Sequence, residues 1–180
     1  MKSLQGKLLI ASPALEDPNF SKAVVLLVRH DEEGALGVII NRPLETTVME
    51  AVGDAVDVPF VVEGSLYQGG PCEGPLMVMH TQEEAGEMRV ADGMYFSVER
   101  DKVEWLLKNE EGLARYFVGY SGWGEGQLEA EMETGSWLLV EGGDEVVFGE
   151  VEELWPRLML AATVGKWIKP GLMPGDPSSN

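Results

Sequence analysis

Short apolar runs dominate the first half of the chain. Residues 7–11, 23–29 and 36–40 are apolar at successive positions, which is typical of strands buried on both faces of a sheet. A turn at 31–34 separates the second run from the third and predicts that these two strands pair antiparallel. Other segments have the same extended character: residues 60–68, 75–80 and 115–120.

Two glycine-containing turns predict hairpins later in the chain. Asp92 and Gly93 lie between two short apolar runs, 88–91 and 94–97, and this dipeptide favours a two-residue hairpin turn. Gly142 and Gly143 similarly separate residues 136–140 from 144–148, and we expect both of these segments to be strands.

Helical spacing follows candidate capping residues at several places. Thr47 and Glu50 have the spacing of a capping box, and Pro59 closes the segment. Ser97 is expected to cap a second helix, which ends by Gly112. The apolar residues of these two helices each share one face: Val48, Val52, Ala55 and Val56 in the first, and Val103, Leu106 and Leu107 in the second.

Two more helices are expected in the last third of the chain. A short one carries Leu128 and Met132. A longer one tolerates Pro156 near its first turn, where a missing N–H costs nothing, and its apolar side consists of Val151, Leu154, Trp155, Leu158 and Ala162. About eight or nine strands and three or four helices, with hairpins predominating, indicate a single α+β domain over residues 1–168. The Pro, Gly and Ser content of residues 169–180 predicts a flexible tail.

Composition adds one unusual feature, a large negative charge. The 180 residues include 31 acids and 13 bases, for a net charge of −18 and a pI near 4.3. Such a chain repels phosphate backbones and anionic membranes, so direct nucleic-acid or membrane binding is not expected. The charge also has an ordinary explanation, since it keeps a domain soluble.

The cysteine and histidine counts exclude several kinds of site. A single cysteine, Cys72, rules out an internal disulfide and a zinc site built from several thiolates. His30 and His80 are the only histidines, so we expect neither a metal site nor a cofactor. The apolar runs are too short to span a bilayer, and Ser12 and Pro13 interrupt the N-terminal one, so no signal peptide is expected. A cytoplasmic location follows as the expectation, and a free thiol fits it.

A glycine-rich segment could cradle a phosphate. Gly122, Gly124 and Gly126 follow a predicted strand and precede a helix, where backbone N–H groups can bind anions. However, residues 117–156 contain ten acids and no Lys or Arg. Each acid at roughly 6 Å would cost an incoming anion on the order of 3 kcal/mol at an effective dielectric constant of about 20. A phosphate would need a cation from elsewhere, such as Arg42; otherwise the glycines serve backbone geometry beside Trp123.

Three other sets of residues could carry chemistry. Cys72 could act as a nucleophile with His30 or His80 as its base, or it could simply fill a turn. Glu129 could act from the first turn of a helix, or it could favour the helix dipole. Arg42, in the sequence Asn-Arg-Pro, could bind a ligand or pair with a nearby acid. Tyr120 and Trp123 could line a small-molecule pocket or pack in the core.

Several motifs in a fixed order carry a resemblance to a known family. The first runs from Leu9 to Leu15 and reads Leu-Ile-Ala-Ser-Pro-Ala-Leu, and the second, Gly34 to Pro43, ends in Asn-Arg-Pro. Gly-Gly-Pro follows at residues 69–71. The most specific motif is Gly-Tyr-Ser-Gly-Trp-Gly-Glu-Gly-Gln-Leu-Glu at residues 119–129. Together these motifs resemble the AlgH/YqgE family of bacterial proteins, over about residues 6–167.

The resemblance implies a fold more firmly than a function. It implies an α+β fold with a bent or split sheet of mixed and antiparallel strands. The family name comes from a proposed role as a transcriptional regulator in alginate production, and the resemblance implies no catalytic residues. Cys72 stands where the family often has a small aliphatic residue. The motif positions are candidate binding residues: Asn41, Arg42, Gly70, Tyr120, Gly122, Trp123, Gly124, Gly126, Gln127 and Glu129.

Three functions remain open from the sequence. The first is a non-enzymatic binding or regulatory protein that contacts a protein or small-molecule partner without binding DNA directly. The second is a hydrolase or thiol-dependent enzyme, with a pocket between the Asn41–Pro43 turn and the glycine-rich segment and with Cys72, His30 and His80 as candidate catalytic residues. The third is an acidic protein that occupies a basic surface of its partner.

Overall fold

The computed structural model describes residues 2–59, 62–109 and 111–167. Their strands form two sheets, which makes the α+β prediction correct. The first sheet is antiparallel throughout and has the order β10-β3-β2-β1-β11. Its strands are β1 Leu8–Ala11, β2 Val24–Asp31, β3 Gly34–Ile39, β10 Ser121–Trp123 and β11 Trp137–Val140.

The second sheet has the order β4-β5-β9-β6-β8-β7. It is mixed, because β5 and β9 pair in parallel while its other neighbours pair antiparallel. Its strands are β4 Pro43–Thr47, β5 Ser65–Gln68, β6 Met77–His80, β7 Met88–Ala91, β8 Met94–Ser97 and β9 Ala114–Val118.

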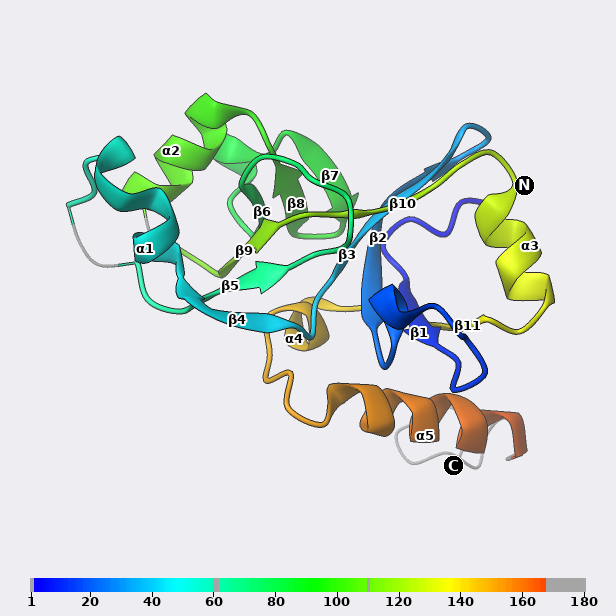
Figure 1. Ribbon diagram of the computed structural model, residues 1–180. Coiled ribbons are helices and arrows are strands. Elements are labelled where there is room, and N and C mark those ends of the chain that lie inside the picture. Colours follow the sequence, from blue (N-terminus) through cyan, green and yellow to red (C-terminus); the bar gives the residue numbers. More distant parts are fainter. Residues whose placement is uncertain (1, 60–61, 110, 168–180) are drawn as a thin grey trace, which may run out of the picture.

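Five α-helices lie within the described ranges and are arranged around the two sheets (Figure 1). Helices α1 and α2 lie beside the second sheet, and α3 and α5 flank the first. The α-helices are α1 Val48–Val52, α2 Arg100–Lys108, α3 Gln127–Glu133, α4 Asp144–Val147 and α5 Leu154–Trp167. Short 3-10 turns occur at Pro18–Phe20, Gly53–Ala55 and Glu83–Ala85.

Three apolar clusters alternate with the sheets. Strand β2 contributes to two of them: Val24 and Leu26 face the cluster shared by both sheets, whereas Val25 and Leu27 face the cluster under α3. This two-sided burial explains the continuous apolar run that predicted the strand. The third cluster joins α1 and α2 to the second sheet.

Arg115 links the second sheet to α4. Its guanidinium lies 4.5 Å from the centre of the Tyr67 ring and donates hydrogen bonds to the carbonyls of Val147 (2.7 Å) and Gly149 (3.0 Å). Burial lowers the pKa of Arg115 from its usual value. These carbonyls lie at and just after the C-terminal end of α4, where a cation is favourable.

Several local predictions are confirmed. The hairpin turn at Asp92 and Gly93 joins β7 to β8. The capping box at Thr47 and Glu50 is present in both directions, with N–H to side-chain distances of 3.1 and 3.2 Å. Pro156 is the third residue of α5, where a missing N–H is tolerated.

Other local predictions are wrong. Residues 144–147 form α4 and not a strand. Ser97 ends β8, and Glu99 is the N-cap of α2, which ends at Lys108 before Gly112. Strands β4 and β10 were not expected, and Gly122 lies inside β10, paired with Leu36. The predicted tail, residues 169–180, lies outside the described residues.

Candidate functional site

The Asn-Arg-Pro turn holds a neighbouring loop in place. The Asn41 side chain accepts the N–H of Val24 (2.9 Å) and donates to the carbonyl of Lys22 (3.0 Å). The Arg42 guanidinium donates to the carbonyls of Asn19 (2.5 Å) and Ser21 (3.0 Å), and burial lowers its pKa. Both side chains therefore hold the 19–22 loop in place, and both terminal nitrogens of Arg42 donate to carbonyls of that loop.

Glu131 organises the tryptophan motif, by which we mean Trp123, Trp137 and the residues of α3 that contact them. One carboxylate oxygen of Glu131 accepts the indole N–H groups of Trp123 (2.8 Å) and Trp137 (3.0 Å). The Gln127 side chain donates to the other oxygen (3.2 Å) and accepts the backbone N–H of Gly124 (3.0 Å). Phe20 stacks on Trp123 with ring centres 6.1 Å apart. The Gly124 amide, a candidate for holding a phosphate, is thus bonded to a side chain of its own loop.

Gly70 and Gly119 let two chain segments cross closely between the sheets. A Cβ added at Gly70 would lie 2.2 Å from the carbonyl of Tyr120, and one added at Gly119 would lie 2.5 Å from the carbonyl of Gly70. Gly119 also has a φ of +76°, which L-residues rarely adopt. Cys72 and Tyr120 form an isolated antiparallel bridge next to this crossing. The structure thus gives Gly70 a packing role.

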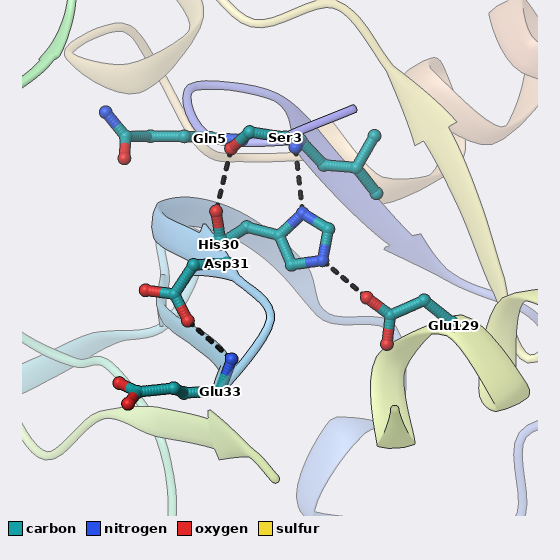
Figure 2. Close-up of polar contacts among 7 residues, drawn as sticks. Ser3, Gln5, His30, Asp31, Glu33 and Glu129 are labelled. Carbon is teal, nitrogen blue, oxygen red and sulfur yellow. Dashed lines mark hydrogen bonds and ion pairs between the residues drawn. The ribbon is translucent and has the colours of Figure 1, made fainter. Parts of the chain in front are cut away.

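His30 and Glu129 meet across 99 positions of sequence (Figure 2). His30 lies near the end of β2, and its Nε2 is 2.6 Å from a carboxylate oxygen of Glu129 on α3. Its Nδ1 accepts the backbone N–H of Leu4 at 2.9 Å, and its carbonyl accepts the Ser3 hydroxyl at 2.8 Å. The histidine therefore ties the N-terminal segment to α3.

The hydrogen bonds of His30 fix its protonation pattern. Because Nδ1 accepts an N–H, the ring proton sits on Nε2 and is donated to Glu129. This hydrogen bond lowers the pKa of the Glu129 carboxyl, which stays ionised. A general base needs a free ring nitrogen, and His30 offers none in this arrangement.

The surroundings of His30 are acidic. A cavity of about 220 Å³ beside it is lined by Ser3, His30, Asp31 and Glu32. The other oxygen of Glu129 is buried and has no hydrogen-bond partner among the described residues. These carboxylates disfavour an anionic ligand. Within the described ranges, no group of three or more His, Cys, Asp or Glu residues could hold a metal ion.

His80 has the same bonding pattern in the second sheet. Its Nδ1 accepts the N–H of Gln82 (3.2 Å), and its Nε2 lies 2.8 Å from the Ser97 hydroxyl. The Ser97 hydroxyl donates to the carbonyl of Ala85 at 2.7 Å, so the ring proton lies on Nε2 and faces the serine oxygen. Burial lowers the pKa of His80 to about 4. The ring cannot take a proton from Ser97, and the pair is a buried structural network.

Cys72 is therefore not brought together with a histidine base. It is half-buried beside a cavity of about 490 Å³ whose walls include Gln68, Gly70 and Glu73. The four ring nitrogens of His30 and His80 are engaged with other groups. The Cys–His arrangement considered from the sequence lacks the hydrogen bond that would activate a thiol.

An apolar groove lies between α1 and α2, and none of its lining residues belongs to the glycine-rich segment. Its volume is about 330 Å³. One wall is α1 with the turn after it, the other is α2, and the end of the groove is formed by the segment before β6. Its lining residues are Ala51, Val52, Ala55, Val56, Pro75, Leu76, Val98, Arg100, Val103, Glu104 and Leu107.

Comparison with known proteins identifies the family. The AlgH-like family model matches residues 8–166. This chain belongs to the AlgH-like family. An AlgH-like relative from Chlorobaculum tepidum, a UPF0301 protein, is 38% identical over 161 residues, covering 84% of this chain and 83% of the relative. A UPF0301 protein from Streptomyces coelicolor is 39% identical over 189 residues, covering 100% of this chain and 97% of its own.

Solved structures agree with the AlgH-like assignment. The solution structure of the AlgH protein from Pseudomonas aeruginosa matches with a TM-score of 0.72 and 28% identity, covering 95% of this chain and 93% of that one. A crystal structure from Corynebacterium diphtheriae, DIP2367, matches with a TM-score of 0.71 over 89% of this chain and 87% of that one. Its identity is 24%, so this second likeness supports the fold alone.

The AlgH-like motifs are thus largely occupied with internal contacts, and their sequence patterns did not predict the groove. The buried helix faces expected on its two sides are confirmed, since Val52, Val103 and Leu107 are at most 9% exposed, but the recess beside them was not predicted. The available signal was the pair of small residues Ala51 and Ala55, both exposed in the structure, beside buried Val52. No described helix of the AlgH-like chain is long and apolar enough to cross a membrane.

Proposed function

We propose that this AlgH-like chain is a non-enzymatic binding protein that exerts regulation through protein contacts, without binding DNA directly. Its binding surface is the groove between α1 and α2, which receives apolar side chains of a protein partner. The observation that carries this proposal is the groove itself, a recess of about 330 Å³ with valine, leucine and alanine in its walls. Open apolar recesses of this kind are typical of binding sites.

The polar sites support binding over catalysis. Both ring nitrogens of His30 and of His80 have partners within the protein, and the two terminal nitrogens of Arg42 each donate to a loop carbonyl. A hydrolase or thiol enzyme would need one of these groups to be free to face a substrate. The net charge of −18 argues in the same direction against DNA as a direct partner. We also propose a cytoplasmic location, with which the free thiol of Cys72 is compatible.

A peptide titration with matched variants tests the proposal. The probe is a short amphipathic helical peptide with a leucine face and glutamine elsewhere, titrated into labelled protein and followed by backbone amide shifts. We expect shifts confined to α1, α2 and residues 75–76, with weak affinity in the micromolar range or above, since the recess is small.

The variant Ala51→Glu places a charge in the groove and should weaken binding at least tenfold. Ala130→Glu is the matched control, because Ala130 is an exposed helical alanine of α3 that does not line the groove. The control should bind as the unmodified protein does. Equal affinity in Ala51→Glu, or shifts spread around Cys72 or His30, would contradict the proposal.

A further inference from the structure

The two walls of the groove differ in charge. Between Arg42 and Arg89 the sequence has no Lys or Arg, and it has nine acids: Glu45, Glu50, Asp54, Asp57, Glu63, Glu73, Glu83, Glu84 and Glu87. This segment supplies α1, the turn after it and the end of the groove at Pro75 and Leu76. The lining residues on the α1 side are themselves apolar, and the charged residues of the segment that surrounds them are all acids.

The acids nearest the lining residues are exposed, although the Glu50 carboxylate also accepts the Thr47 N–H in the capping box. Asp54 adjoins the lining residue Ala55, and Asp57 adjoins Val56. Both aspartates, like Glu50 on α1, are exposed. Their charge is not neutralised by neighbours in sequence, because the nearest base before them is Arg42.

The α2 wall is nearly balanced instead. Over residues 99–108 it has three acids and three bases. At the groove itself Arg100 donates to Glu104 at 2.7 Å, one turn further along the helix. This wall thus presents apolar side chains and the Arg100–Glu104 ion pair, whose charges balance each other. It therefore contributes little to whether a cationic or an anionic partner is preferred.

We infer that the occupant of the groove is an amphipathic helical segment of a protein partner, with apolar residues facing the groove and Lys or Arg along the flank that faces α1. This inference rests on the proposed function and adds the chemical class of the partner. The apolar walls supply the contact area, and the anionic α1 side selects the sign of the flanking charge.

The dimensions of the groove set the length of the segment. Helix α2 has nine residues, so its wall is about 13 Å long, which corresponds to somewhat more than two turns of helix. A helix lying along it presents anchors at positions i, i+3 or i+4, and i+7. Cations on the adjoining face then lie beside residues 50–57.

Three peptides of one design test the charge of the partner. All carry the same leucine face, and their flanks carry Lys, Gln or Glu. At low ionic strength we expect the Lys peptide to bind at least tenfold more tightly than the Glu peptide, with the Gln peptide between them. Salt at 0.5 M should remove most of this difference, because the contacts are solvent-exposed.

A pair of protein variants locates the effect. Asp54→Asn with Asp57→Asn should reduce the Lys-over-Glu preference severalfold. Asp144→Asn with Glu145→Gln is the control, since these exposed acids of α4 do not line the groove, and it should preserve the preference.

The outcomes separate this inference from the proposed function. Equal binding of all three peptides, sensitive to Ala51→Glu, would overturn the charge inference and leave the binding function standing. Absence of binding by every peptide would overturn both. Sedimentation of the protein alone gives a further test: a dimer that Ala51→Glu abolishes would make a second copy of this chain the occupant and overturn the inference.

Discussion

The polar site at His30 and the apolar groove between α1 and α2 differ in whether their side chains already have partners within the protein. At His30, both ring nitrogens, the backbone carbonyl and one Glu129 oxygen already have partners. In the groove, valine and leucine side chains form the walls of a recess of about 330 Å³. Polar side chains of the motifs thus hold the fold together, whereas the mainly apolar lining of the groove leaves a recess at the surface.

This contrast shows that residues of specific motifs can serve the fold. Hydrogen-bonded groups inside a protein are costly to leave unpaired, so residues that hold loops and strand ends together are strongly constrained. Glu131, with two indole donors and a glutamine, is such a residue. A binding groove needs only shape and apolar surface, which many sequences supply.

The largest effect that we expect tests whether the folded protein shields the His80 ring from protonation. Burial lowers the pKa of His80 from 6.5 to about 4, so the folded protein binds fewer protons there than the unfolded chain. The stability that neutral His80 contributes is present above pH 6.5 and falls by about 3 kcal/mol as the pH drops to 4. The advantage of the wild type over His80→Gln in urea unfolding should shrink by that amount between pH 7 and pH 4. A constant difference would mean that the ring is accessible to protons in the folded state.

The next effect tests whether the tryptophan motif is structural. Glu131→Ala removes the acceptor of two partly buried indole N–H groups and should lower the free energy of unfolding by about 2 kcal/mol. Glu133→Ala, an exposed change on the same helix, should cost less than about 0.5 kcal/mol. Denaturant unfolding at pH 7 measures both. Equal stabilities of the two variants would remove the structural explanation of the motif.

A smaller effect tests the link between α3 and the N-terminal segment. Glu129→Gln replaces a charge-assisted hydrogen bond with a neutral one and should cost about 1 kcal/mol at most, because the carboxylate is partly exposed. The depressed pKa of Glu129 means that its contribution is present above pH 4.5 and is lost at lower pH. The affinity of the peptide for the groove should be unchanged in this variant. A tenfold loss of affinity would show that the two regions are coupled and would contradict their separation.

The smallest effect concerns the thiol. Cys72→Ser should change the free energy of unfolding by less than about 0.5 kcal/mol, since the side chain is half-buried and its backbone makes the bridge to Tyr120. It should leave peptide affinity unaltered in the same titration. Loss of a cellular or biochemical activity in a folded Cys72→Ser protein would instead favour a thiol-dependent function.

The fold class and most strands could be predicted from local pattern. A few neighbouring residues are enough to determine each of these features: the apolar runs of β2 and β3, which are buried on both faces, the Asp92-Gly93 hairpin and the Thr47 capping box. Residues 144–147 were misassigned because Gly142 and Gly143 imitate a hairpin turn, whereas Arg115, distant in sequence, holds carbonyls at the end of the helix that forms there.

The candidate site depended on contacts that no local pattern reveals. Glu129 was a candidate by its place on a helix, but its partner His30 lies 99 residues away. Arg42 was considered as a ligand for anions, and only the folded chain brings the carbonyls of Asn19 and Ser21 to its guanidinium. The groove was missed because an apolar helix face predicts burial without saying whether the neighbouring element fills the space.

The most direct test is to locate a bound peptide by intermolecular nuclear Overhauser contacts. Isotope-filtered spectra of labelled protein with the unlabelled Lys-flanked peptide would report which methyl groups touch its leucines. We expect contacts to Val56, Leu76 and Val98, the half-buried lining residues that carry methyl groups, with the peptide lysines nearest to residues 50–57. Contacts centred on Cys72 or His30 and absent from these three residues would contradict the account.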